Sequence, residues 1–397
     1  MTTVDANTYK VLDLFSGCGG LSLGLDMVER GESRVFNTTA AVDHWLPACN
    51  TYELNLGLKP ICESVDGSSV LNALQQHGPF DVVVGGPPCQ GFSTSGKRAL
   101  DDPRNSLVLE FLRAVEITKP SAFLMENVSG FRSFQGGAIF KETLEMANAL
   151  GFEVRSAVVQ ASHYGVPQRR KRFILVGVMG RNAIRFGDEL DRDGLFEFPS
   201  SDSVHLDEVL NPEKERWTFW DAVSDLPPLN AGEESASYLS KPLNDLQNYF
   251  RSASHSKVLS HRAMGHKPGF IKMMGYIPQG KSALDPDINC QIPKEIRPGK
   301  GFPNSYSRIR ADFPSPTITR NFTTPSSANC IHPFSDRALS FREGARLQTF
   351  PDHFRFTGTS EQVRLQIGNA VPPRLGKYLG ELLADELHSG GFIPKIS

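Results

Sequence analysis

The stretch Asp13-Leu-Phe-Ser-Gly17-Cys-Gly19-Gly20-Leu-Ser-Leu-Gly24 places a glycine-rich turn between a short apolar run and a helical pattern. In an open α/β sheet such a turn holds a nucleotide-like cofactor, because glycines let the backbone approach the ligand closely. The next apolar run ends at Asp43, where an acid can accept hydrogen bonds from ribose hydroxyls. A purely structural turn is the alternative. No Gly-Lys-Ser/Thr sequence completes this turn, which argues against a P-loop for triphosphates here.

The first half of the chain alternates short β-rich runs with helical patterns. This alternation predicts an α/β fold with a doubly wound, mostly parallel sheet and crossover helices. The predicted strands are Val11 to Phe15, Phe36 to Val42, Asp81 to Val84, Ala122 to Met125 and Arg172 to Val178. Helices are expected after the glycine turn to about Arg30, from about Pro47, over Ser106 to Ile117 and over Arg374 to His388, the last packing back on the first domain.

Periodicity weakens between residues 186 and 335, where prolines are frequent. This pattern predicts a second, smaller, loop-rich domain. We therefore expect residues 1–185 with 364–397 to form one domain and residues 186–363 to form the other.

Composition excludes several classes of protein. The 397 residues are 39% hydrophobic and 22% charged, and no apolar run is long enough to span a bilayer. The first ten residues lack a basic stretch followed by an apolar core, so a cytoplasmic location is expected. The six cysteines are scattered, which argues against zinc clips and a disulfide framework.

Charge is distributed unevenly along the chain, although the formal net charge is only -2. Residues 186–250 hold 15 acids against 4 bases, whereas residues 251–310 hold 11 bases against 3 acids, with aromatic residues between them. The basic stretch predicts a nucleic-acid surface. A solvated basic face with no partner explains the charge alone equally well.

A second candidate site is Gly85-Gly-Pro-Pro88-Cys89-Gln90-Gly-Phe-Ser93, at the carboxyl end of a predicted strand. Ligands of open α/β sheets bind outside these strand ends. Glycines and prolines hold a loop in one shape, which suits a cysteine nucleophile that must meet its target at a fixed angle. The alternative is a buried apolar cysteine, which we prefer for Cys18, Cys49 and Cys62.

Two further stretches carry charged groups at strand ends. Phe123-Leu-Met-Glu126-Asn127-Val128 ends an apolar strand in a carboxyl group that could act as a proton donor in an apolar crevice, or could simply cap the next turn. In Gln168-Arg169-Arg170-Lys171-Arg172, strand geometry would put Arg170 and Arg172 on one face. Two guanidinium groups suit a phosphate, a base carbonyl or a carboxylate, and a salt-bridged edge strand is the alternative.

In this order the segments resemble the motifs of the DNA (cytosine-5)-methyltransferases. The resemblance continues near the end of the chain with Arg342-Glu343-Gly-Ala-Arg346-Leu-Gln348 and Gln366-Ile-Gly368-Asn369-Ala-Val371-Pro-Pro373. It implies the class I S-adenosylmethionine-dependent methyltransferase fold. It also implies methyl transfer to carbon 5 of cytosine.

The resemblance implies a role for each of four side chains. Cys89 adds as a thiolate to carbon 6 of the base, and Glu126 protonates ring nitrogen 3. Arg172 holds Glu126 and the base, and Arg170 lies near the thiol or a phosphate. No metal is needed.

S-adenosyl-L-methionine is the implied cofactor, with S-adenosyl-L-homocysteine as its product. Asp43 would bind the ribose, Asp66 the adenine amino group and Leu107 the adenine ring, while Asn369 and Val371 close the methionine end. The remaining expected contacts are Phe15, Ser16, Gly17, Gly19 and Pro88.

Duplex DNA is the implied substrate and partner, with a cognate restriction endonuclease as a further partner and no membrane. The target cytosine should be flipped out of the helix, since a stacked base cannot reach the thiol. The target-recognition segment would be short, about His261 to Asn304. The alternatives are an RNA (tRNA) cytosine-5 methyltransferase and a catalytically silent DNA-binding partner.

Overall fold

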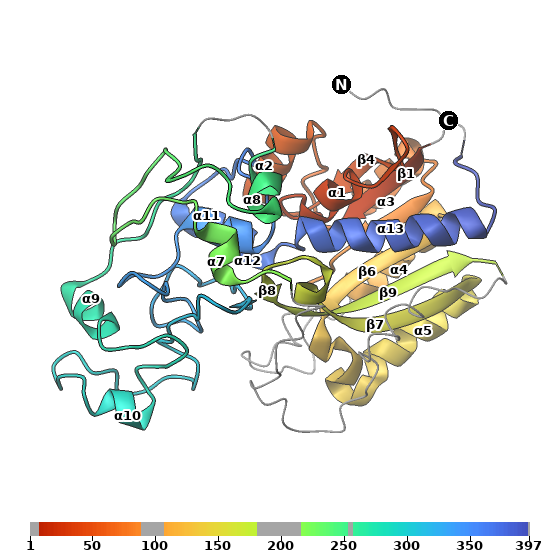
Figure 1. The fold of residues 1–397 in the computed structure, drawn as a ribbon. Helices are drawn as coiled ribbons and strands as arrows, with labels where there is room; N and C mark the ends of the chain where they lie inside the picture. The colour runs from red at the N-terminus through yellow and green to blue at the C-terminus, as the bar shows by residue number, and fades with distance from the viewer. Residues whose placement is uncertain (1–7, 89–106, 181–215, 253–256, 396–397) are drawn as a thin grey trace. The chain divides into compact units, whose positions relative to one another are not determined.

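The computed structural model describes residues 8–88, 107–180, 216–252 and 257–395, which form two compact units (Figure 1). The first unit takes the described residues of Met1–Gln160, Lys171–Glu208 and Pro373–Ser397, and the second takes those of Ala161–Arg170 and Val209–Pro372. The domain limits drawn from the sequence stay a prediction. Among the described residues, the compact units differ from them at residues 161–170 and 364–372.

A six-stranded sheet in the order β4-β1-β5-β6-β9-β7 forms the centre of the first unit. Neighbouring strands from β4 to β6 pair in parallel, whereas β9 pairs antiparallel with both β6 and β7. The strands of this unit are β1 (Tyr9–Leu14), β2 (Glu29–Arg30), β3 (Ser33–Arg34), β4 (Phe36–Val42), β5 (Val82–Gly85), β6 (Ala122–Val128), β7 (Phe152–Gln160) and β9 (Lys171–Met179). The mostly parallel α/β sheet predicted from the sequence is thus confirmed.

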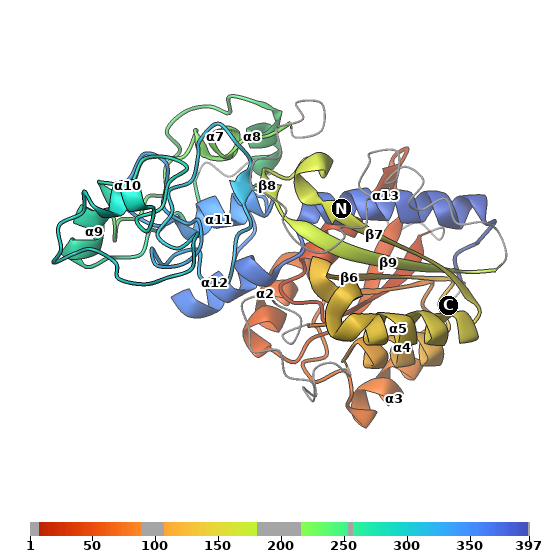
Figure 2. The same cartoon turned by 90° about the horizontal axis from the view of Figure 1, so that it is seen from below.

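Helices cover both faces of this sheet. Figure 2 shows α13 on one face and α3, α4 and α5 on the other. The helices of the unit are α1 (Gly20–Leu25), α2 (Leu46–Leu56), α3 (Ser68–His77), α4 (Leu107–Thr118), the 3₁₀ segment η2 (Ser129–Gly137), α5 (Ala138–Ala149) and α13 (Pro373–Ser389). Helix α13 packs on α1, which agrees with the prediction that the C-terminal helix packs back on the first domain. The two backbones meet so closely that a Cβ on Gly24 would lie 2.7 Å from the Cα of Gly376.

Two boundaries differ from the sequence expectations. The first helix ends at Leu25 instead of continuing to about Arg30, because the chain turns back at Gly31 (φ 63°) and pairs β2 with β3. Strand β6 extends through Glu126 to Val128, because it continues to pair with the start of β9. The sequence reading did not identify α3, α5 or β7.

The second unit is rich in loops, as predicted. In the described part of the chain its helices have at most ten residues and its strands two. Its elements are η3 (Ala161–Tyr164), β8 (Gln168–Arg169), α7 (Phe219–Val223), α8 (Asp245–Phe250), α9 (Pro268–Met274), α10 (Pro286–Asn289), β10 (Ser315–Pro316), α11 (Phe341–Leu347) and α12 (Ser360–Asn369).

Buried arginines hold these loops together. Arg342 donates to the carbonyl oxygens of Leu259, Pro351 and Phe354 at 2.6–3.0 Å. Arg308 likewise donates to four backbone carbonyls. Buried carbonyl groups need partners, and few strands are present to supply them. The guanidinium groups therefore stabilise the unit in place of a sheet.

The charges of these arginines are balanced by buried acids. Arg346 contacts the carboxylates of Asp225 and Asp352, and Arg337 binds both oxygens of Glu343, at 2.7 and 2.8 Å. These paired side chains are almost fully buried, as is the case for Arg337, Glu343, Arg346 and Asp352. Buried charges of this kind are tolerated only when paired. Among the described helices, none has the length and apolar character needed to cross a membrane.

We predict that the stability of the second unit falls as the medium becomes acidic. Burial lowers the pKa of His332 to about 4, and the positive charges of Arg337 and Arg308 act in the same direction, against the opposing effect of Glu343. An unfolded histidine has a pKa near 6.5, so the stability contributed by the neutral ring is present above about pH 6.5 and lost as the pH falls towards 4. The loss should reach about 3 kcal/mol.

Urea unfolding at pH 7, 5.5 and 4 checks this prediction, with Trp217 and Trp220 as fluorescent probes in the second unit. In His332→Asn the side-chain oxygen can replace Nδ1 as the acceptor of the Phe334 N–H without titrating. This variant should lose less stability than the wild type between pH 7 and 4. Equal losses in the two proteins would contradict the assignment to His332.

Candidate active site

The glycine turn after β1 has left-handed backbone at three positions, with φ of 56° at Phe15, 55° at Gly17 and 90° at Gly19. The N–H of Ser16 donates to the carbonyl of Val42 at 3.0 Å, which ties the turn to the end of β4. A Cβ on Gly17 would meet no atom within 4 Å, so the turn has an open side there. A bulky residue such as Phe15 rarely adopts positive φ, and such strain is concentrated at functional sites.

Asp43 directs its carboxylate at this turn. One oxygen accepts the N–H of Gly17 and the other accepts the N–H of Trp45, both at 2.8 Å. Asp43 is 8% exposed. Each carboxylate oxygen has a further lone pair, so these bonds leave capacity for a ligand hydroxyl. The carboxylate thus joins the end of β4 to the first turn, which the sequence reading did not anticipate.

A buried hydrogen-bond cluster behind the turn was also missed from the sequence. Ser22 of α1 donates from Oγ to Asp13 at 2.6 Å and accepts from the hydroxyls of Tyr52 at 2.8 Å and Thr38 at 3.4 Å. Burial raises the pKa of Asp13 to about 7; the bond from Ser22 opposes this change and the charge of Asp43 adds to it. A polar residue following the glycines on an otherwise apolar helix face was the only signal for this cluster.

Glu126 lies beside the loop that leads to Cys89. A Cβ on Gly86 would be 3.2 Å from Oε2 of Glu126, and the side-chain amide of Asn127 donates to the carbonyl of Pro87 at 3.3 Å. These contacts follow from the parallel pairing of β5 with β6, which brings the carboxyl ends of both strands to one edge. Cys89 and the rest of the loop to Ser93 lie outside the described residues.

Arg172 forms an ion pair with Glu126, with Nε 2.7 Å from Oε1. The two side chains are 13% and 11% exposed. Burial lowers the pKa of Arg172, while the charge of Glu126 and its hydrogen bond oppose that change. The antiparallel pairing of β6 with β9 sets Arg172 opposite Val128, near the end of β6. The structure therefore brings together two residues that the sequence reading had linked only by resemblance.

Arg170 differs from the sequence expectation. It lies between β8 and β9, not on a strand face shared with Arg172, and it belongs to the second unit. Its guanidinium group donates to the carbonyls of Ile318, Gly368 and Ala370 at 3.1–3.2 Å. The prediction that Arg170 and Arg172 share one face of a strand was wrong, because the strand is interrupted at Arg170. A contact of Arg170 with a thiol or phosphate stays a prediction.

The structure also shows where the remaining residues predicted to contact the cofactor lie. Leu107 is the first residue of α4, Pro88 is half-buried and Asp66 is an exposed turn residue before α3. Asn369 ends α12, and Val371 follows it in the second unit. Their contacts with a cofactor stay predictions.

The buried thiols suit the structural role expected for them. Burial raises the pKa of Cys18 to about 12, and it raises that of Cys49 as well. Cys62 is only half-buried, so the expectation of a buried cysteine was wrong at this position. Thiols that keep their protons are poor nucleophiles. In the described ranges, no three His, Cys, Asp or Glu side chains gather in a way that could hold a metal ion.

The fold and these residues define a class of protein: an α/β protein whose strand order reverses at β1, which lies between β4 and β5. In such sheets, ligands bind outside the carboxyl ends of the strands where the strand order reverses. The glycine turn, Asp43 and Glu126 all lie at this edge.

The chain belongs to the C-5 cytosine-specific DNA methylases, whose family model matches residues 9–384. It is 33% identical to the type II methyltransferase M1.HphI of Haemophilus parahaemolyticus, over 93% of this chain and 85% of that protein. It is 32% identical to the type II methyltransferase M.AgeI of Thalassovita gelatinovora, over 94% of this chain and 99% of that protein. It is thus a DNA (cytosine-5)-methyltransferase of a family that depends on S-adenosylmethionine.

Solved structures share the fold. One is that of a candidate DNA modification methyltransferase encoded within an E. coli prophage, with a TM-score of 0.69 and 25% identity over 96% of this chain and 100% of that chain. The S. pombe Dnmt2 methyltransferase has a TM-score of 0.57 and 17% identity over 97% of this chain and 100% of that chain, which is a likeness of fold.

We predict strong coupling between Glu126 and Arg172. A double-mutant cycle with Glu126→Gln and Arg172→Met should give a coupling free energy of about 1–3 kcal/mol, because each single change leaves a nearly buried polar group without its partner. Urea unfolding of the four proteins measures this value. The exposed pair Lys141 and Glu145 provides a control cycle that should show little coupling. A coupling near zero at Glu126 and Arg172 would contradict the role of the ion pair.

Proposed function

We propose that this chain methylates carbon 5 of a cytosine flipped out of duplex DNA, with Cys89 as the nucleophile and Glu126 as the proton donor. The ion pair of Glu126 with Arg172, beside the loop that leads to Cys89, is the observation that carries the proposal. A restriction-modification role with a cognate restriction endonuclease is proposed from the type II relatives.

The thiolate of Cys89 forms a bond to carbon 6 while ring nitrogen 3 takes a proton from Glu126. The electron pair of the ring double bond is thereby directed to carbon 5, which becomes nucleophilic. S-adenosylmethionine would supply the methyl group to carbon 5 and leave as S-adenosylhomocysteine. Loss of the carbon 5 proton to a base then restores the ring double bond and breaks the bond to the sulfur of Cys89, which returns the thiolate, while ring nitrogen 3 gives its proton back to Glu126. Arg172 orients the carboxyl group of Glu126 throughout. Cysteine, carboxyl and guanidinium groups supply this chemistry without a metal ion.

The glycine turn fits S-adenosylmethionine. The Oγ atom of Ser16 is buried and has no hydrogen-bond partner among the described residues, which leaves it available to a polar group of a ligand. The open side at Gly17 and the remaining lone pairs of Asp43 supply space and acceptors. S-adenosylmethionine would supply an electrophilic methyl group here. Phe15, Ser16, Gly17 and Asp43 would hold it.

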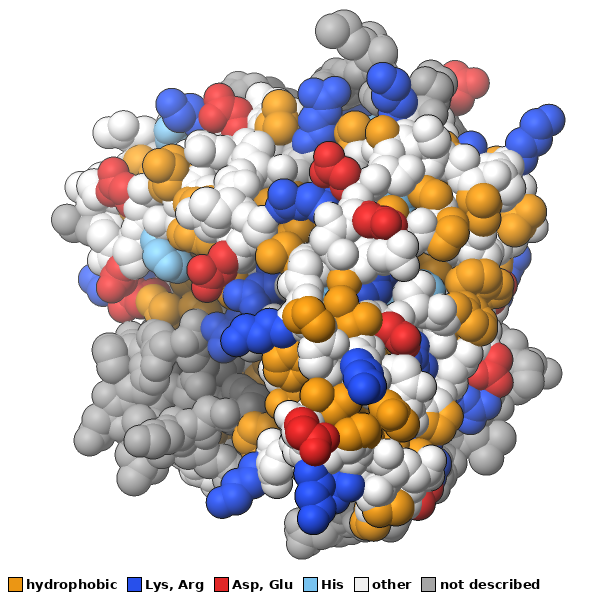
Figure 3. Space-filling model, turned by 90° about the vertical axis from the view of Figure 1, so that its left-hand side faces the viewer, with side chains coloured by type: hydrophobic (Ala, Val, Ile, Leu, Met, Phe, Trp, Pro, Cys, Tyr) orange, Lys and Arg blue, Asp and Glu red, His pale blue; other side chains and the backbone are white. Residues whose placement is uncertain are grey.

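The basic stretch 251–310 is the proposed duplex surface. Several of its bases have acidic partners, such as Arg308 with Asp336 and Arg310 with Asp312. No ion pair of Lys267 or Lys272 is found in the described parts of the chain. On the face seen in Figure 3, Lys and Arg side chains lie among hydrophobic and acidic ones. Flipping the base allows the thiol and Glu126 to reach it.

We predict that Cys89→Ala abolishes methyl transfer and leaves S-adenosylmethionine binding intact, because the thiol acts on the base and not on the cofactor. Transfer of labelled methyl to duplex DNA and to total RNA in parallel, with base-resolution mapping, measures the activity. Calorimetry measures cofactor binding. An active Cys89→Ala protein would refute the proposed nucleophile, and label in RNA alone would refute DNA as the substrate.

Asp43→Asn should weaken S-adenosylmethionine binding about 10-fold or more, because an amide cannot accept both backbone N–H groups and also bind ribose hydroxyls. Calorimetric titration of the wild type and the variant checks this. Glu53→Gln, an exposed change on α2, is the matched control and should bind as the wild type does. Unchanged affinity in Asp43→Asn would remove Asp43 from the cofactor site.

A further inference from the structure

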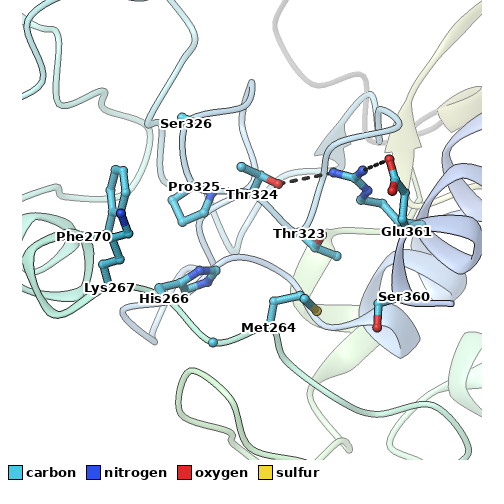
Figure 4. Close-up of a pocket in the computed structure, with 12 residues that line it drawn as sticks. Met264, His266, Lys267, Phe270, Thr323, Thr324, Pro325, Ser326, Ser360 and Glu361 are labelled. Atoms are coloured by element: carbon cyan, nitrogen blue, oxygen red, sulfur yellow. Dashed lines mark hydrogen bonds and ion pairs between the residues drawn. The ribbon is translucent and has the colours of Figure 1, made fainter.

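The second unit contains a pocket of about 420 Å³ that the proposed chemistry does not use (Figure 4). Three segments line it: residues 264–267 with Phe270 at the start of α9, the loop 323–326, and the first turns of α12. Figure 4 shows His266, Lys267 and Phe270 on one side and Thr324 and Glu361 on the other. The volume suits one nucleotide.

His266 presents a hydrogen-bond donor at this pocket. Its Nε2 accepts the backbone N–H of Ala338 at 3.1 Å, so the neutral ring carries its proton on Nδ1. Burial lowers the pKa of His266, and the charge of Arg337 acts in the same direction, which favours the neutral ring. Nδ1 has no hydrogen-bond partner among the residues that the structure describes.

Two cations line the pocket, and the exposed one, Lys267, adds a further donor to it. The Nε–H of Arg364 is buried and lacks an acceptor within the described ranges, although its terminal nitrogens contact Glu361 at 3.5 Å and Thr324 at 3.4 Å. Lys267 is exposed, with no ion pair in the described parts of the chain. The one acid that lines the pocket, Glu361, already faces Arg364. The His266 ring and the Lys267 ammonium group, which lack acceptors in the described parts of the chain, are therefore hydrogen-bond donors at this pocket.

The pocket also has an apolar side. Phe270 is partly exposed, and Met264 and Pro325 contribute further apolar atoms. The ring of Phe270 lies at 16° to that of Tyr306, with centroids 6.3 Å apart. Aromatic side chains bind the flat faces of bases, and stacking contributes about 1–3 kcal/mol per base. Donors beside an aromatic wall suit a ligand with a flat ring and hydrogen-bond acceptors.

We infer that this pocket binds one nucleotide of the substrate DNA, other than the methylated cytosine, and selects guanine. On its major-groove edge guanine offers two acceptors, N7 and O6, whereas adenine and cytosine each present an amino donor and thymine one acceptor with a methyl group. A set of unpaired donors therefore favours guanine. The pocket lies within the unit that carries the basic stretch 251–310, so its nucleotide would come from a bound duplex and leave the base stack to lie against Phe270. The inference rests on the proposed function.

The test is sequence preference in binding, which does not depend on methyl transfer. The full chain with S-adenosylhomocysteine selects duplexes from a random library, and the bound sequences are compared between the wild type, Lys267→Ala and Phe270→Ala. Both variants should lose preference for guanine at one shared position by about 10-fold, the usual cost of one mismatched base pair. Lys241→Ala, an exposed lysine of the second unit that lies outside the stretch 251–310 and does not line the pocket, should keep the wild-type preference.

A change in the DNA provides a second measurement, which compares the wild type with Lys267→Ala. Replacing that guanine with 7-deazaguanine removes the N7 acceptor and should weaken wild-type binding about 10-fold, and Lys267→Ala should be less sensitive to the replacement. Equal sensitivity of the two proteins would overturn the inference. So would a preferred sequence with no guanine besides the partner of the target cytosine.

Two further outcomes would also contradict the pocket assignment. The variants could keep the wild-type preference at every position. They could instead weaken binding to all sequences equally and flatten its salt dependence, which is the behaviour of a phosphate contact. Failure of the proposed function is distinct, because a wild type that binds DNA with this preference but transfers no methyl group refutes the chemistry and leaves the pocket assignment intact.

Discussion

Parallel pairing of β4, β1, β5 and β6 is the constraint on which the candidate site of the first unit depends. It places the carboxyl ends of four strands at one edge. The groups of the site lie at these ends, namely the glycine turn, Asp43, Gly86 and Glu126. No single loop could bring these groups together. The antiparallel strand β9 completes the arrangement, because it sets Arg172 beside the end of β6 where Glu126 needs a counter-charge.

The second unit solves a different problem, since it has few strands to satisfy its backbone. Arg308 and Arg342 bind carbonyl groups that a sheet would otherwise pair, while Arg337 and Arg346 are neutralised by buried carboxylates. A guanidinium group can donate five hydrogen bonds in a fixed plane, so a few arginines order many loop carbonyls. Loops fixed in this way can present a pocket of defined shape, as around His266 and Phe270.

Local pattern was enough to predict much of this architecture. Apolar runs bounded by turns located five strands, and a helical pattern at the end of the chain located α13. The predictions that failed depended on contacts between distant parts of the chain. The early end of α1 depends on the β2–β3 hairpin, and the separation of Arg170 from Arg172 depends on carbonyl groups more than 140 residues away. The partners of Asp43 and Ser22 likewise come from other elements, which local sequence does not reveal.

The hydroxyl of Ser22 has one hydrogen atom and two lone pairs, and all three are used. While Asp13 is ionised, Tyr52 and Thr38 donate to Ser22, and Ser22 donates to Asp13. A hydroxyl saturated in this way has no rotational freedom left to lose. The side chains on this side of the turn therefore lose their conformational freedom when the chain folds, not when a ligand binds. A ligand that binds at Gly17 meets a preorganised backbone.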